Sequence, residues 1–241
     1  MKIDVVIPVL NEEQTLERGT RKVLEFLGAQ GGEAWDVRIV LADNGSTDRT
    51  GELGEKLAAD HENVAYLRVP DPGVGRALKA AWGQSDAEIV GYIDLDLATD
   101  LKHLPEAFGA IIGHGADIVF GTRLHKNSRV VNRTLKRAAI SRIFNFAVRR
   151  YLGVSLSDGM CGFKFLRRPV LERLLDGGAI SDGWFFCTEI LVVAEWLGLN
   201  ARELPVHWTD DPNSRVKLGK LTCEYLRAMH NLRKRRPRHG A

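Results

Sequence analysis

Strand-like and helix-like stretches alternate through the first half of this sequence, and this alternation constrains the fold more than any other feature. Apolar runs of strand length occupy residues 3–9, 37–42, 64–69 and 87–93, and each is followed by apolar residues at helical spacing. A further strand is expected at 117–121. Strands that alternate with helices pair in parallel and place helices on both faces of the sheet. We therefore expect an α/β domain with a Rossmann-like, mostly parallel sheet flanked by helices.

The second half of the chain is less regular, and its helices are expected at the periphery of the domain. It contains an apolar helical segment at 188–197, a strand-like segment at 202–208 and an amphipathic helix at 218–232. We expect one domain over residues 1–226 and a basic tail over 227–241, whose composition favours disorder.

Ligands of an open α/β sheet bind beyond the carboxyl ends of its strands. In this sequence the predicted strand ends are followed by polar side chains, namely Asn11, Glu12, Asp43, Asn44, Asp94, Asp96 and Arg123. Because parallel strands end at the same edge, these side chains should form one cluster.

The motif Asp94-Leu95-Asp96 stands directly after an apolar strand. Side chains two residues apart on an extended backbone point the same way, so both carboxylates should converge. Mg²⁺ is typically held by one or two carboxylates and substrate phosphate oxygens, and Mn²⁺ takes similar ligands. The motif therefore predicts Mg²⁺ or Mn²⁺ bound to a diphosphate. A solvated strand end is the alternative for an isolated motif of this kind.

Two neighbouring turns give weaker signals. Asp43 could accept hydrogen bonds from a nucleobase or ribose, whereas Ser46 and Thr47 are expected to cap the helix that follows. The segment from Gly73 matches a dinucleotide fingerprint only in part, because Leu78 replaces the third glycine. A tight turn is the simpler interpretation of that segment.

Positive charge is concentrated in two segments of a chain whose net charge is only +3. Residues 123–150 contain nine basic residues and no acidic one, and five more basic residues lie within 233–238. Apolar residues such as Ile143 and Phe146 interleave with the first group, a pattern typical of helices on anionic membranes. A core helix with one solvated basic face is the alternative. Nucleic acid is disfavoured because aromatic stacking platforms and known motifs are missing.

Charged residues of the second half suggest two further contributions to a site. Arg215 and Lys217 follow Asp210 and Asp211 on a loop that suits a clamp on a diphosphate, and a solvated turn is the alternative. Glu189 begins an apolar helix, either to satisfy its dipole or to face the site.

The cysteines and the chain ends bear on the compartment. Cys161, Cys187 and Cys223 lack the spacing of a disulfide framework or a zinc site. The sequence has no apolar run of membrane-spanning length and no signal-peptide pattern. We expect reduced thiols and a cytoplasmic protein.

Taken together, the segments PVLNEE, ADNGSTDRT, DLDLATD, GTRL, SDGMCGFKFLRR, WFFCTEI and DDPNSRVKL resemble the inverting GT-A glycosyltransferases that make polyprenyl-phosphate sugars. The chain looks most like the dolichyl-phosphate mannose and glucose synthases and their bacterial relatives, in order from Val5 to Lys217. The resemblance implies a GT-A fold and metal-dependent transfer of a hexose or N-acetylhexosamine from a nucleotide-diphosphate sugar to a polyprenyl or dolichyl monophosphate.

The resemblance also implies roles for individual residues. The implied donor site consists of Pro8, Leu10, Glu12, Asp43, Asp94 and Lys217. The implied metal ligands are Asp94 and Asp96, and the implied acceptor-phosphate site consists of Arg123, Arg137 and Asp158. The residues implied in catalysis are Asp94, Asp96, Arg123 and Arg215.

Some positions depart from the family pattern. Asn44 stands where many relatives have a second aspartate, and Ala98 stands where the mannose synthases often have a glutamine, so the sugar is left open. No membrane-spanning helices follow residue 217, unlike many relatives. Contact with the cytoplasmic membrane is therefore expected to be peripheral, through residues 123–150, or to depend on a membrane-protein partner.

The excess of cations agrees with a phosphate acceptor. A polyprenyl monophosphate has a second pKa of about 6, by analogy with phosphorylated side chains, so its oxygen is anionic at pH 7 and needs no general base. One alternative is a saccharide acceptor activated by Glu189 or Asp158. The other is a non-catalytic peripheral module that binds lipid through its basic segment.

Overall fold

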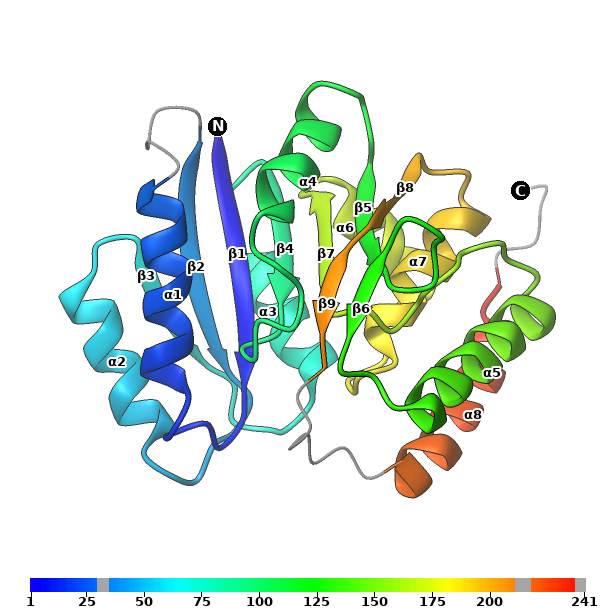
Figure 1. The fold of residues 1–241 in the computed structure, drawn as a ribbon, viewed down its shortest axis with the longest axis horizontal. Coiled ribbons are helices and arrows are strands. Elements are labelled where there is room, and N and C mark those ends of the chain that lie inside the picture. The colour runs from blue at the N-terminus through cyan, green and yellow to red at the C-terminus, as the bar shows by residue number, and fades with distance from the viewer. Residues whose placement is uncertain (30–34, 211–217, 237–241) are drawn as a thin grey trace.

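The structure, a computed structural model, describes residues 1–29, 35–210 and 218–236, and of residues 218–223 it describes the backbone alone. Strands and helices alternate along the first half of the chain, as the sequence predicts (Figure 1). In chain order the elements are β1 (Lys2–Val9), α1 (Leu16–Ala29), β2 (Asp36–Asp43), α2 (Thr50–Asp60), β3 (Val64–Arg68), α3 (Val74–Gln84), β4 (Ile89–Ile93), α4 (His103–Ile112), β5 (Ile118–Thr122), β6 (Arg129–Val131), α5 (Leu135–Leu152), β7 (Phe163–Arg167), α6 (Val170–Asp176), α7 (Phe186–Trp196), β8 (Ala201–Pro205), β9 (His207–Thr209) and α8 (Leu218–Lys234).

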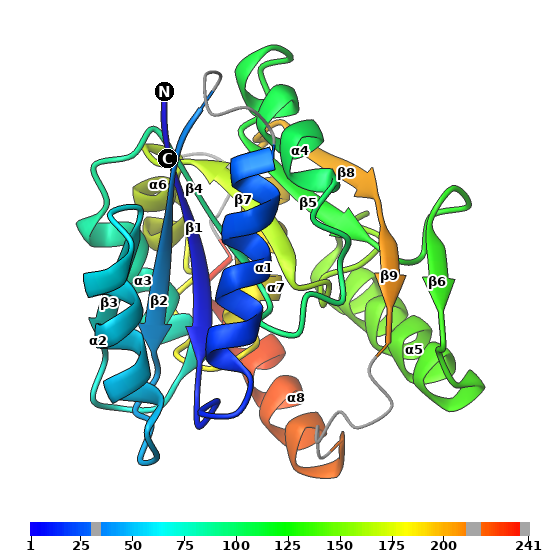
Figure 2. The same cartoon turned by 60° about the vertical axis from the view of Figure 1, so that its left-hand side comes forward.

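A seven-stranded sheet forms the centre of the domain, in the order β3-β2-β1-β4-β7-β5-β8. Neighbouring strands are parallel except where β7 pairs with β4 and β5. A second, two-stranded sheet pairs β6 with β9 and lies beside the large one (Figure 2). The predicted mostly parallel α/β sheet is confirmed.

Both faces of the large sheet are covered by helices, which explains the continuous apolar runs in its strands. Val5, Val6 and Ile7 of β1 are wholly buried. Helices α1, α2 and α4 contribute to the apolar core on one face, and α3, α6 and α7 contribute to the core on the other. Helices α5 and α8 pack at the outside of this second core, as expected for the second half of the chain (Figure 2).

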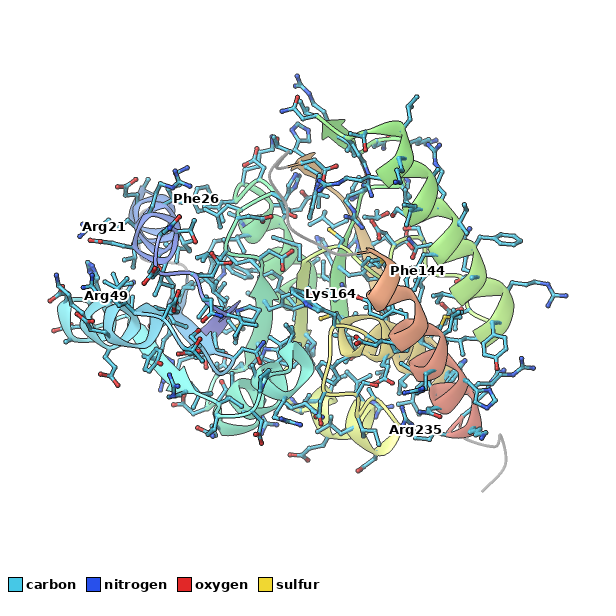
Figure 3. The ribbon with its side chains drawn as sticks, turned by 90° about the horizontal axis from the view of Figure 1, so that it is seen from below. Arg21, Phe26, Arg49, Phe144, Lys164 and Arg235 are labelled. Atoms are coloured by element: carbon cyan, nitrogen blue, oxygen red, sulfur yellow. The ribbon has the colours of Figure 1, made fainter. Side chains whose placement is uncertain are left out.

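Strand β7 is missing from the sequence prediction, which has only a turn-rich segment at 157–163 and no strand after it. The strand enters the sheet antiparallel, between β4 and β5. Lys164 at its centre is wholly buried and lies near the middle of the molecule (Figure 3). A lysine is almost never fully buried, so its presence conceals the strand pattern.

The strand predicted at 202–208 is divided in two. Strand β8 ends at Pro205, and β9 begins at His207. Proline has no backbone N–H for the ladder. The first part therefore stays with β5, while the second leaves the large sheet and pairs with β6.

The C-terminal segment is helical where a tail was expected from residue 227. Helix α8 continues to Lys234, and Met229 and Leu232 are buried in the core. Phe144 of α5 faces Tyr225 of α8, with ring centroids 5.3 Å apart (Figure 3). Residues 237–241 lie outside the described part of the chain.

Candidate functional site

Four strands of the large sheet end beside polar side chains. Strands β1 and β2 both run downward in the view of Figure 1. Asp43 is the last residue of β2, Asp94 follows β4, and Arg123 follows β5. Strand β1 pairs in parallel with both β2 and β4. Asp43 and Asp94 therefore lie at the same edge of the sheet, as the sequence predicts.

Asp43 is wholly buried, and both of its carboxylate oxygens already accept hydrogen bonds. Oδ1 accepts from the Ser46 backbone N–H at 2.8 Å. Oδ2 accepts from the Tyr66 hydroxyl at 2.6 Å and from Arg68 Nη1 at 3.1 Å. Asp43 therefore shapes the turn that follows β2. Among the residues predicted to bind the nucleotide, Asp43 is the one whose carboxylate accepts the most hydrogen bonds from within the protein.

The loop after β1 is joined to that turn by side chain to backbone hydrogen bonds. Asn11, with a left-handed φ of 55°, accepts from the Thr47 N–H at 2.9 Å and donates its own N–H to Ser46 Oγ at 3.0 Å. The Glu12 N–H donates to Thr50 Oγ1 at 2.7 Å. Ser46 and Thr47 thus hold the neighbouring loop. The expectation that they cap α2 is wrong, because Arg49 is at the N-cap position and its side chain makes no capping hydrogen bond there.

The other predicted donor residues border this same corner. Pro8 is half-buried near the end of β1, Leu10 is exposed just beyond it, and the Glu12 carboxylate accepts a hydrogen bond from the Thr15 hydroxyl. Buried Asn44 accepts from the Gly73 N–H, so it fastens the turn at residue 73 to the end of β2.

Asp94 and Asp96 lie in different environments at the end of β4. Asp94 is half-buried, and its Oδ1 is buried without a hydrogen-bond partner in the described part of the chain. Burial, and then the negative charge of Asp96, raise the pKa of Asp94 to about 7 against the opposing effect of Lys164 and Arg123. Asp96 is exposed, and its Oδ1 accepts from the Ala98 N–H at 3.0 Å.

This pair of acids suits a divalent cation. Both are hard oxygen donors, and the orphaned Oδ1 of Asp94 is a buried acceptor that a cation would satisfy. Within the described ranges no group of three or more histidine, cysteine, aspartate or glutamate side chains is placed to hold a metal.

Gly162, which the sequence does not mark as functional, controls how Asp94 sits. A Cβ atom at residue 162 would lie 1.7 Å from Asp94 Oδ2 and 2.2 Å from its Cγ. The Asp94 N–H also donates to the Gly162 carbonyl at 3.3 Å. Only glycine leaves room for the carboxylate at this point.

Lys164 supports the turn that contains Gly162. Its Nζ donates to the Cys161 carbonyl at 2.5 Å and to the Tyr92 hydroxyl at 3.3 Å. Its positive charge also opposes the effect of burial on Asp94, so the pKa of Asp94 is raised less than burial alone would raise it. A buried lysine whose charge acts on Asp94 is the feature of this region that sequence reasoning missed most clearly. The signals in the sequence are a lysine inside the apolar run Phe163–Leu166 and its place in the segment SDGMCGFKFLRR.

Arg123 and Asp158 form a buried, two-pronged ion pair. Arg123 Nε and Nη2 donate to Asp158 Oδ2 and Oδ1 at 2.7 and 2.9 Å, and the Arg123 N–H donates to Oδ2 at 3.1 Å. Burial alone would raise the pKa of Asp158, but the Arg123 guanidinium outweighs it and lowers this pKa to about 2. The guanidinium also stacks 4.7 Å from the Trp208 ring centroid. Asp158 therefore fixes Arg123 and stays ionised.

Two further arginines of the basic segment meet Asp210. Arg137 Nη1 lies 3.4 Å from Asp210 Oδ1, and Arg133 Nε lies 3.7 Å from Asp210 Oδ2. Burial, and then the charge of Arg123, lower the pKa of Arg133, which shows that these cations lie close together. The sequence analysis placed Arg137 in the acceptor-phosphate site. It named Asp210 only as a residue that precedes the loop with Arg215 and Lys217.

Strand β9 connects the acidic and basic parts of the site. The Thr209 N–H donates to the Ala98 carbonyl at 2.8 Å, two residues beyond Asp96. The next N–H, that of Asp210, donates to the Val131 carbonyl at 3.1 Å. Residues 209 and 210 thus contact both the loop that follows Asp96 and strand β6, which precedes Arg133 and Arg137. Beside Asp96, a cavity of about 790 Å³ opens between α1, β6 and β9.

Some candidates are not brought to this cluster. Glu189 is wholly buried, and it accepts hydrogen bonds from the Ser181 N–H at 2.7 Å and from Arg235 Nη2 at 2.8 Å. It therefore holds the end of α8, which agrees with a structural role. Arg215 and Lys217 lie outside the described residues.

Comparison with protein families gives one match that covers most of the chain. The model of glycosyl transferase family 2 matches residues 4–175. This range contains both metal-binding candidates and the Arg123–Asp158 pair.

Several curated proteins are similar to the chain over most of its length. Glycosyltransferase AglD of Haloferax volcanii is 34% identical over 90% of this chain and 35% of that protein. Dolichyl-phosphate beta-glucosyltransferase ALG5A of Trichomonas vaginalis is 27% identical over 90% of this chain and 68% of that protein. Undecaprenyl-phosphate 4-deoxy-4-formamido-L-arabinose transferase of Salmonella paratyphi B is 29% identical over 86% of this chain and 59% of that protein. The chain thus spans about a third to two thirds of the length of these relatives.

A solved structure shares the fold. Glucosyl-3-phosphoglycerate synthase from Mycobacterium tuberculosis, in complex with Mn²⁺, UDP and glucosyl-3-phosphoglycerate, superposes with a TM-score of 0.67 at 22% identity. The match covers 99% of this chain and 82% of that one. The fold is therefore that of the GT-A glycosyltransferases, as the sequence resemblance implies.

Proposed function

Because the chain belongs to glycosyl transferase family 2, we propose that it transfers a hexose or N-acetylhexosamine from a nucleotide-diphosphate sugar to a polyprenyl or dolichyl monophosphate. The relatives named for dolichyl-phosphate and undecaprenyl-phosphate transfer support this class of acceptor. The observation on which the proposal depends is a group of three partly or fully enclosed arginines. The Arg123 side chain is 8% exposed and its charge acts on Asp94, and the Arg133 and Arg137 side chains, 11% and 29% exposed, both face Asp210.

The arginines favour an acceptor that arrives as an anion. A phosphate monoester is a dianion above its second pKa of about 6, so its oxygen can attack without losing a proton. Guanidinium groups bind phosphate oxygens in pairs and reduce the repulsion between the acceptor phosphate and the donor diphosphate. In the proposed step, an acceptor oxygen bonds to the anomeric carbon as the bond from that carbon to the diphosphate oxygen breaks. The electron pair leaves with the nucleotide diphosphate, and the anomeric carbon is inverted.

In this proposal Asp94 and Asp96 hold Mg²⁺ or Mn²⁺. When bound, the cation would neutralise negative charge on the departing diphosphate. Gly162 and Lys164 keep Asp94 in position, and the corner formed by Pro8, Leu10, Glu12 and Asp43 borders the nucleotide. Arg215 and Lys217 are proposed to add positive charge on the donor phosphates. The cavity beside Asp96 falls within the range of about 300–1,000 Å³ that is common for small-molecule sites.

The two carboxylates that could serve as bases for a saccharide acceptor are poorly suited to that role. Asp158 is held by Arg123, and a pKa of about 2 makes it a weak base. Both oxygens of Glu189 accept hydrogen bonds from Ser181, and Arg235 adds an ion pair. These contacts weigh against a mechanism that removes a proton from a hydroxyl.

We propose that the outer face of α5 binds the cytoplasmic membrane surface, with or without a membrane-protein partner. Leu135, Ile143 and Phe146 are 90%, 67% and 62% exposed. They share a face with Lys136 and Arg142, and the whole helix has no acidic residue. Apolar side chains can enter the interface while each nearby cation adds about 1 kcal/mol with anionic lipid. Across the described part of the chain, no helix has the length and apolarity needed to cross a bilayer.

Vesicle binding tests the membrane proposal. Wild type should float with vesicles that contain anionic lipid and less with zwitterionic ones, and Ile143→Ser with Phe146→Ser should reduce flotation. Equal flotation of the double variant would contradict the assignment of this face. Leu226→Ser, which alters an exposed apolar residue on α8, serves as the comparison.

A transfer assay tests the proposed reaction. The protein is incubated with Mn²⁺, polyprenyl phosphate and each of a panel of nucleotide sugars, and the lipid product is separated by chromatography. One donor should give a polyprenyl-phosphate sugar, Asp96→Ala should abolish the product, and Asp86→Asn at the opposite edge of the sheet should not. Full activity of Asp96→Ala, or of wild type with excess chelator, would contradict the assignment of the metal site.

A further inference from the structure

Asp210 occupies the place where the proposed acceptor phosphate would meet its arginines. Its two carboxylate oxygens face Arg137 and Arg133 at 3.4 and 3.7 Å. The side chains of Arg133 and Asp210 are only 11% and 12% exposed. Charges in so enclosed a place interact more strongly than exposed surface pairs.

This contact is looser than the ion pair beside it. Arg123 reaches Asp158 at 2.7 and 2.9 Å, within ordinary hydrogen-bond range. In contrast, Arg133 Nε and Asp210 Oδ2 are both buried without a hydrogen-bond partner in the described residues. Buried charged groups normally satisfy their hydrogen bonds. The Asp210 carboxylate therefore balances the charge of Arg133 without forming a hydrogen bond to its Nε.

A phosphate monoester would fill that capacity better than a carboxylate does. It has three free oxygens and up to two negative charges, and guanidinium groups bind such oxygens in pairs. The Asp210 main chain is anchored, because its N–H donates to the Val131 carbonyl at 3.1 Å. An arriving phosphate therefore has to displace the Asp210 side chain while the backbone stays in place.

We propose that Asp210 is a placeholder for the acceptor phosphate and a determinant of acceptor specificity, an inference that rests on the proposed function for the identity of the acceptor. A dianionic monoester displaces the carboxylate from Arg133 and Arg137 and gains stronger contacts with them. An alcohol brings no charge, and a phosphodiester brings only one negative charge and two free oxygens. Neither gains enough to displace Asp210, so the site selects a terminal phosphate.

Binding of inorganic phosphate tests the placeholder directly. Calorimetric titration at pH 8, where phosphate is a dianion, should show about tenfold tighter binding to Asp210→Asn than to wild type, because one competing like charge has been removed. Asp210→Ala should show the same direction of change. Arg133→Gln should weaken binding, and Asp86→Asn should leave it unchanged. Equal or weaker phosphate binding by both Asp210 variants, with their thermal unfolding intact, would overturn the proposal and identify Asp210 as a support for the arginines.

A second titration separates this inference from the proposed function. A short-chain isoprenyl monophosphate should bind wild type much more tightly than its methyl diester, and Asp210→Asn should reduce that preference by about tenfold. An unchanged preference would overturn the specificity role. If wild type binds no isoprenyl monophosphate while Asp210→Asn still gains affinity for inorganic phosphate, the proposed acceptor is wrong and the placeholder stands.

Discussion

Replacing Asp158 with asparagine should separate the structural and the functional parts of the Arg123–Asp158 pair. The two side chains are 8% and 0% exposed, so Asp158→Asn leaves the Arg123 guanidinium buried without its counter-charge. Removing one partner of a buried ion pair costs about 3–5 kcal/mol. For a chain of 241 residues each kcal/mol corresponds to about 2–4 °C, so the melting temperature should fall by roughly 6–20 °C.

The same pair gives the protein a defined sensitivity to acid. Burial opposes ionisation of Asp158, but Arg123 lowers its pKa from 3.8 to about 2. A carboxyl whose pKa is lower in the folded state stabilises the fold above its unfolded pKa, and this contribution disappears as the pH falls through the folded pKa. The shift corresponds to about 2 kcal/mol, which wild type should lose between about pH 4 and pH 2. Asp158→Asn should lack this step.

Denaturant unfolding, followed by circular dichroism from pH 7 to pH 2, measures both effects. Asp86→Asn is the matched control, since Asp86 belongs to an exposed ion pair with Lys2 and should change stability little. A double variant, Arg123→Met with Asp158→Leu, should regain stability because no buried charge is left unpaired, yet it should still fail in transfer. If Asp158→Asn unfolds like wild type at pH 7, the pair is not buried as described and this reasoning fails.

Three further predictions concern neighbouring parts of the structure. Gly162→Ala should fold but bind Mn²⁺ at least about tenfold more weakly, because its Cβ would collide with the Asp94 carboxylate, and equal Mn²⁺ affinity by calorimetry would contradict the close approach. The affinity of wild type for Mn²⁺ should decrease as the pH falls below 7, because the pKa of Asp94 is raised to about 7 and protons compete with the metal for its carboxylate. An Mn²⁺ affinity that stays constant between pH 6 and pH 8 would argue against Asp94 as a ligand. Arg235→Ala should lower the free energy of unfolding by about 1–3 kcal/mol, because it removes an ion-pair partner of buried Glu189. Lys234→Ala, at an exposed position, should not lower it. Equal melting temperatures of the two variants would show that Glu189 does not hold the end of α8.

The first half of the fold follows from the sequence because its signals are local. Periodicity indicates β1 to β5 and the intervening helices, and parallel pairing then brings Asp43 and Asp94 to one edge. The pair Asp94 and Asp96 could be identified in the same way, from spacing on an extended backbone.

The remaining features depend on contacts between distant segments. Strand β7 is concealed by Lys164, whose burial is offset by hydrogen bonds to Tyr92 and Cys161 that no local pattern reveals. The basic end of α8 suggests disorder by composition, but Arg235 pairs with Glu189 and Arg233 stacks 4.5 Å from the Tyr151 ring. Similarly, Asp210 meets Arg133 and Arg137 only because β9 leaves the large sheet to pair with β6.

The most direct test of the proposed function compares two acceptors that differ only in the phosphate. Transfer from the preferred nucleotide sugar is measured with polyprenyl phosphate and with the corresponding polyprenol, at equal concentration, with Mn²⁺ and at pH 7.5. We predict a glycosylated product with the phosphate and none with the alcohol. A product formed from polyprenol at a comparable rate would show that the protein activates a hydroxyl, and it would contradict an acceptor that is already ionised.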